Sequence, residues 1–138
     1  METNLPNLLT ASSILLGIIT ALYGLFYPDI KNVIEIIPKQ HKVDNKQNYI
    51  KSKNVFNGKY LPLMLGAIIT TLIYLPELYK QILKSITVIT TNSFDNVKYD
   101  TMTASFIAVC IFMLLITIMI IRIGFKMNNK IKKLNPKE

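Results

Sequence analysis

Residues 101–121 read TMTASFIAVCIFMLLITIMII and contain no charged side chain. A helix needs roughly 20 apolar residues to cross the ~30 Å hydrocarbon core of a bilayer, so this stretch is long enough to span one. Leu8–Tyr27 and Leu61–Pro76 are also uncharged, although the second reaches 19 residues only when it is extended past Pro76 and Glu77 to Tyr79. Three such stretches in 138 residues leave no room for a sizeable soluble domain. The sequence therefore predicts an all-α membrane protein with three transmembrane helices.

The chain is expected to form a single membrane domain over residues 1–138, with its helices arranged up-down-up. The predicted helices cover about 8–27, 61–79 and 102–125. The predicted connections are a basic loop at 28–60, an outer loop at 80–101 and a basic tail at 126–138. The apolar fraction of 51% and the mean hydropathy of +0.35 agree with lipid as the main solvent.

Basic residues are distributed unevenly between the connections. Seven lysines lie between the first two apolar stretches, and six basic residues follow the third stretch, but only three lie in the second connection. Because basic loops are retained in the cytoplasm, we predict an outside N-terminus and a cytoplasmic C-terminus in the plasma or inner membrane. Residues 1–7 carry no Lys or Arg, so the first span is expected to be a retained anchor rather than a cleaved signal peptide.

The net charge of +8 has two interpretations. Clustered basic residues can bind nucleic acid, but in a membrane protein they more often record loop orientation, and we favour that interpretation. The expected partner is the bilayer itself, through anionic headgroups at the cytoplasmic face. Arg122 and Lys126 lie near the cytoplasmic end of the third span, where long basic side chains reach lipid phosphates. A buried, functional Arg122 is the alternative.

Prolines mark two uncertain boundaries. Residues 29–37 lie between Pro28 and Pro38 and have apolar side chains at helical spacing. They could form a short helix in the headgroup plane or extend the first span, and the sequence does not choose. Lys39–Lys59 is expected to be a solvated loop, and Pro76 is expected to end or kink the second span.

Small residues predict where helices approach closely. In lipid, small side chains favour association because they let backbones come together. The first span carries such residues on one helix face, and the other spans offer two each: Ser13, Gly17, Ala21 and Gly24; Gly66 and Thr70; Ala104 and Ala108. We expect these faces to meet inside one three-helix bundle. The alternative is that the Gly17 face binds another protomer or a larger partner.

The sequence lacks the usual marks of catalysis. No charge lies near the middle of a span, where ionisable groups serve proton or ion paths. His41 is the sole histidine, Cys110 is the sole cysteine, and no phosphate-binding loop, nucleophile elbow or HExxH motif is present. We therefore expect neither an enzyme nor a cofactor or metal site.

With catalysis set aside, the sequence is compatible with two kinds of function. The first is a structural or interaction protein, a helical subunit that packs with itself or within a larger membrane assembly. The second is a pore-forming or membrane-permeabilising protein. In layout alone the chain is similar to the phage holins with three spans, an outside N-terminus, a cytoplasmic C-terminus and a basic tail. That resemblance involves no sequence motif, and the first connection is long for such a protein.

Overall fold

The computed structural model describes residues 4–39, 45–91 and 100–135, and this part of the chain is all-helical apart from short connections. In chain order the elements are α1 (Leu5–Glu35), α2 (Lys46–Val55), a π-helical turn η2 (Phe56–Tyr60), α3 (Leu61–Thr91) and α4 (Thr101–Leu134). Three segments are long and apolar enough to cross a membrane: α1, the run from α2 into α3, and α4. The chain is therefore a multi-pass membrane protein.

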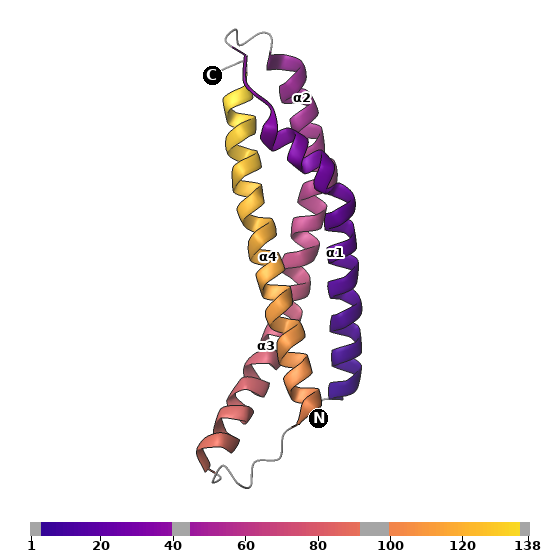
Figure 1. Cartoon of the computed structure of the whole chain (residues 1–138), viewed down its shortest axis with the longest axis vertical. Coiled ribbons are helices and arrows are strands. Elements are labelled where there is room, and N and C mark those ends of the chain that lie inside the picture. Colours follow the sequence, from indigo (N-terminus) through magenta and orange to yellow (C-terminus); the bar gives the residue numbers. More distant parts are fainter. Residues whose placement is uncertain (1–3, 40–44, 92–99, 136–138) are drawn as a thin grey trace.

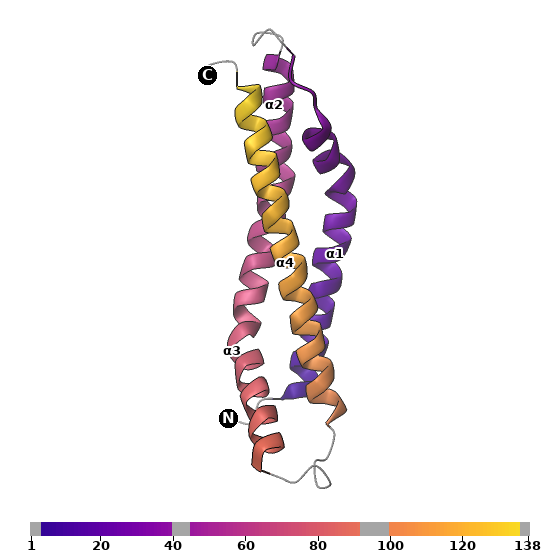
Figure 2. The same cartoon turned by 60° about the vertical axis from the view of Figure 1, so that its left-hand side comes forward.

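The long helices form an elongated bundle (Figure 1). α1 leads away from the end at which the N-terminus lies, α3 returns toward that end, and α4 runs back to the end that holds α2 and the C-terminus (Figures 1 and 2). We call these the N-terminal end and the C-terminal end of the bundle. α4 packs along both α1 and α3, whereas α1 and α3 contact each other less.

The core follows a regular spacing along α4. Its buried residues alternate between steps of four and three: Phe106, Cys110, Met113, Thr117, Ile120, Gly124, Met127, Ile131 and Leu134. A repeat averaging 3.5 residues keeps one seam of a helix against its neighbours, as in left-handed coiled coils. The inward face of α1 has compatible spacing, with Ser12, Ile19, Ile30 and Val33 buried. The bundle is thus held by heptad packing along α4.

Residues 29–35 continue the first helix. α1 runs through Pro28 to Glu35, which matches the extension alternative for this segment. Ile30 and Val33 are buried in the same core cluster as Ile19, so tertiary packing holds these turns in place. Pro28 cannot donate a backbone hydrogen bond, and the last turns of α1 change direction in Figure 1. The predicted end of the helix at Tyr27 is therefore too early.

The expectation of a solvated loop over residues 39–59 is wrong for most of its length. α2 and η2 occupy Lys46–Tyr60 and lead directly into α3. Val55 and Phe56 pack against the core, and Tyr60 is fully buried there. Because residues 39–59 are mainly polar, their composition did not indicate the few apolar contacts that hold α2 and η2 in place. His41 lies outside the described residues.

α3 also extends further than predicted. It passes through Pro76 and continues to Thr91, so the connection placed at 80–101 begins as helix. Leu78 and Gln81 are buried, which shows that the bundle still covers one face beyond the proline. In Figure 1 the lower half of α3 diverges from α4. The proline therefore does not end the helix.

Asp100 caps the start of α4. Its carboxylate accepts hydrogen bonds from the Met102 N–H (3.0 Å), the Thr103 N–H (3.4 Å) and the Thr103 hydroxyl (2.6 Å). The first N–H groups of a helix have no partner within the helix, so an aspartate here satisfies them. The Thr103 hydroxyl bond is the main reason that the pKa of Asp100 lies below its ordinary value.

This cap should be lost in acid. Because the folded-state pKa of Asp100 is lowered, its stabilisation is complete above the usual carboxyl range and disappears as the pH falls through the lowered value. Hydrogen exchange should show several-fold weaker protection of the Met102 and Thr103 amides at that point. Asp100→Asn keeps an acceptor oxygen but does not titrate. Identical pH profiles for the wild type and this variant would show that Asp100 is not the titrating cap.

Candidate functional site

The small-residue face of α1 lies on the outside of the bundle. Ser13, Gly17, Ala21 and Gly24 are all exposed. A Cβ atom built on Gly17 or Gly24 would meet nothing within 4 Å. The expectation that this face packs inside the bundle is therefore wrong. The residues of α1 that face inward are Ser12, Ile19, Ile30 and Val33, which lie on nearly the opposite side of the helix.

The other predicted packing residues have mixed positions. Thr70 is buried, but its hydroxyl donates to the Gly66 carbonyl of the same helix (2.7 Å) and does not bridge two helices. Gly66 is exposed, Ala104 is half-buried and Ala108 is exposed. Among these four, only Thr70 belongs to the packed interior.

A groove of about 370 Å³ separates α1 from α3. Large apolar side chains make up much of its lining, and Gly66 and Thr70 contribute on the α3 side. Its residues are Leu15, Ile18, Ile19, Leu22, Phe26, Gly58, Lys59, Pro62, Leu63, Gly66 and Thr70. Ile19, which is buried on the inward face of α1, also lines this groove, so the groove lies on a different side of α1 from the small-residue face.

The ring of Tyr60 packs directly against α4 at Gly124. A Cβ atom built there would lie 2.9 Å from both Cε1 and Cζ of Tyr60 and would overlap its hydroxyl. Tyr60 is fully buried, and its hydroxyl donates to the Ile120 carbonyl of α4. The absence of a side chain at Gly124 thus makes room for the ring. This contact was not predicted, although the position of Gly124 in the α4 heptad could have revealed it.

Two threonines form a polar contact between α3 and α4. The hydroxyl oxygens of Thr71 and Thr117 are 2.8 Å apart, and that of Thr117 is also 3.4 Å from the Ala67 carbonyl. Both threonines are buried. In an apolar surrounding each hydroxyl needs a partner, so the pair favours one alignment of the two helices.

Replacing Thr71 and Thr117 singly and together should measure the energetic coupling between their hydroxyl groups. Valine has nearly the same shape as threonine but has no hydroxyl group. A double-mutant cycle of Thr71→Val and Thr117→Val should give a coupling of about 0.6 kcal/mol, with ~1.7 kcal/mol as an upper bound. The measurement is unfolding in detergent. A cycle between Thr70→Val and Thr117→Val should give almost none, because the Thr70 hydroxyl binds within its own helix.

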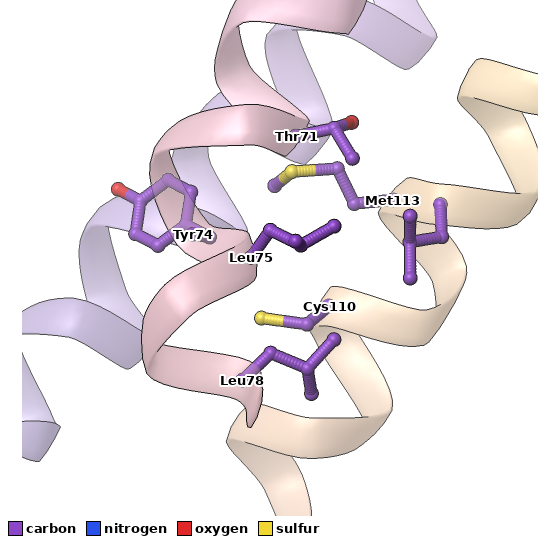
Figure 3. Close-up of a pocket in the computed structure, with 7 residues that line it drawn as sticks. Thr71, Tyr74, Leu75, Leu78, Cys110 and Met113 are labelled. Atoms are coloured by element: carbon purple, nitrogen blue, oxygen red, sulfur yellow. The ribbon is translucent and has the colours of Figure 1, made fainter. Parts of the chain in front are cut away.

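Between these threonines and the N-terminal end of the bundle, the contact surface between α3 and α4 (the α3–α4 seam) is apolar and closed. Figure 3 shows Tyr74, Leu75 and Leu78 from α3 beside Cys110 and Met113 from α4. The space between these side chains cannot hold a water molecule. Tyr74 also packs edge-on against Phe106, with ring centroids 6.5 Å apart. The cysteine therefore serves as an apolar core residue.

Most charged side chains of the described residues are exposed, whereas that of Glu77 is only 13% exposed. Arg122 and Lys126 are exposed on α4, so the alternative of a buried Arg122 is wrong. Lys59 forms an ion pair with Asp29 that ties η2 to α1. At the other end, Glu77 pairs with Lys80 (3.6 Å) and accepts a hydrogen bond from Gln81 (2.8 Å).

Within the described residues, no group of three or more His, Cys, Asp or Glu side chains could hold a metal ion. Comparison with protein-family models, curated proteins and solved structures finds no match to this chain. The exposed small-residue face of α1 is therefore the candidate functional site.

Proposed function

We propose that this protein is a structural or interaction subunit that associates in the membrane, with itself or within a larger assembly, through the outer face of α1. The supporting observation is that the small residues along this face are exposed, and that a Cβ atom built on Gly17 or Gly24 would meet nothing within 4 Å. Small residues let another helix backbone approach closely, which is a main source of helix association in lipid. The protein has no catalytic role in this proposal.

The proposed orientation places the C-terminal end of the bundle in the cytoplasm and the N-terminus outside. The basic residues of α2 and of the last turns of α4 support it, since both segments lie at the C-terminal end (Figure 1). Lysine- and arginine-rich segments are retained on the cytoplasmic side of a plasma or inner membrane. Arg122 and Lys126 would then face anionic headgroups.

Two tagged copies of the chain test the association. Both copies are expressed together, extracted in mild detergent, and recovered through one tag. We expect either the second tag or a defined set of membrane subunits in stoichiometric amount. A particle that is strictly monomeric and has no partner would contradict the proposal.

The holin-like alternative makes a different prediction. A lesion-forming protein should cause prompt loss of membrane potential on controlled expression, whereas a packing subunit should accumulate harmlessly. Potential-sensitive dye fluorescence during induction distinguishes the two. Early depolarisation would favour the alternative over the packing subunit.

A further inference from the structure

A second cleft opens at the C-terminal end of the bundle, between the α2–η2 segment and the last turns of α4. It has a volume of about 260 Å³. Its lining consists of two lysines, three asparagines, two aromatic residues and one aliphatic residue, with no acidic side chain: Tyr49, Lys53, Phe56, Asn57, Asn128, Ile131, Lys132 and Asn135. This composition differs from that of the apolar groove between α1 and α3.

The two lysines give the cleft its charge. Lys53 comes from α2 and Lys132 from α4, and both are exposed. Within the described part of the chain, neither forms an ion pair with an acidic side chain. The Lys53 ammonium instead lies 5.9 Å from the centroid of the Tyr49 ring. Two like charges on opposite walls favour a bound anion, and lysine and asparagine N–H groups can both donate to phosphate oxygens.

The position of the cleft along the bundle indicates where that anion comes from. α4 has 34 residues and is about 51 Å long at a rise of 1.5 Å per residue, well beyond the ~30 Å bilayer core. Its apolar part ends near Phe125, so Asn128 and Lys132 lie roughly 5–10 Å further along the axis. Lipid headgroups occupy that depth. Ile131 is buried beside the lysines, and Phe56 adds a second apolar contact.

We propose that this cleft binds the phosphate of an anionic phospholipid headgroup. The cleft is separate from the outer face of α1, so the proposal does not depend on the proposed association. Lys53 and Lys132 hold the phosphate from opposite sides, while the amide groups of Asn57 and Asn128 supply further donors. The lipid would thereby link α2 to the end of α4.

The test measures lipid preference in bilayer nanodiscs. Spin-labelled phosphatidylglycerol and phosphatidylcholine report how strongly each lipid associates with the protein. Lys53→Gln and Lys132→Gln should each lower the preference for phosphatidylglycerol about tenfold, which is the effect expected when the phosphate loses one charge-assisted hydrogen bond. Lys51→Gln and Lys130→Gln, also made singly, are the matched control pair, since each removes the same charge from α2 or α4 outside the cleft lining.

The control pair should change the preference less than twofold. An equal loss in the control and cleft variants would show general surface attraction and would overturn the proposal, as would no loss in either. Millimolar inorganic phosphate distinguishes a lipid from a free phosphate. Unchanged lipid preference in its presence supports the lipid, whereas displacement of phosphatidylglycerol would assign the cleft to a soluble phosphate and contradict the proposal.

Discussion

Replacing Gly124 with alanine is expected to destabilise the bundle by about 1–3 kcal/mol, the usual result of adding a methyl group to a filled core. The added Cβ atom would lie 2.9 Å from two atoms of the Tyr60 ring, and real side chains do not pack so closely. The ring cannot simply move, because its hydroxyl is bonded to the Ile120 carbonyl. This expected loss of stability is larger than the stabilisation from the higher helix propensity of alanine relative to glycine, which is up to ~1 kcal/mol. Thermal or denaturant unfolding in detergent measures the change.

Gly17→Ala is the matched control for this prediction. A Cβ atom at Gly17 meets nothing within 4 Å, so this substitution should leave stability unchanged or raise it slightly. Tyr60→Leu tests the cause, because without the ring Gly124→Ala should cost much less. Equal losses from Gly124→Ala in the presence and absence of Tyr60 would show that the close contact does not govern this site.

Replacing Gly17 with leucine is expected to weaken association at least about tenfold while leaving the fold intact. Leucine would project from the middle of the small-residue face and hold another helix away, so the close contacts that drive association in lipid would be lost. Energy transfer between fluorescently labelled copies in vesicles measures self-association. Where the partner is a different subunit, its recovery with the tagged chain measures the effect.

Ala108→Leu controls for the larger side chain. Ala108 is an exposed small residue on α4, so its replacement adds similar bulk to a different surface of the bundle. We expect this variant to associate as the wild type does. If Gly17→Leu associates normally, or if Ala108→Leu is equally impaired, the outer face of α1 is not the association surface.

The spans could be predicted from sequence because lipid imposes simple requirements. An uncharged run such as Thr101–Ile121 has few alternatives to a membrane helix, since its backbone groups must be satisfied within the segment. The ends of the membrane-spanning helices could not be predicted in the same way. Pro28 and Pro76 lie inside helices because packing of residues such as Ile30 and Leu78 holds the turns beyond each proline. That packing depends on neighbours distant in the sequence.

The packing faces show a similar limit. Small-residue spacing marks where a helix can be approached closely, but it does not say by which helix. In α1 the inward face is the one with larger side chains, such as Ile19 and Ile30, and the small residues face outward. The better internal signal is the unbroken four-and-three spacing from Phe106 to Leu134, which includes Gly124. A search for heptads in α4 would have found the Tyr60 contact surface that composition alone did not indicate.

Photo-cross-linking in native membranes tests the proposed association most directly. A photoreactive amino acid replaces Ile14, a large exposed residue beside Ser13 at the edge of the small-residue face, in one variant and Phe112, an exposed residue of α4, in another. The outer face of α1 should give a discrete protein adduct at position 14, either with a second copy or with a defined partner, while position 112 reacts with lipid alone. Protein adducts at position 112 with only lipid adducts at position 14 would contradict the proposal that this protein associates through α1.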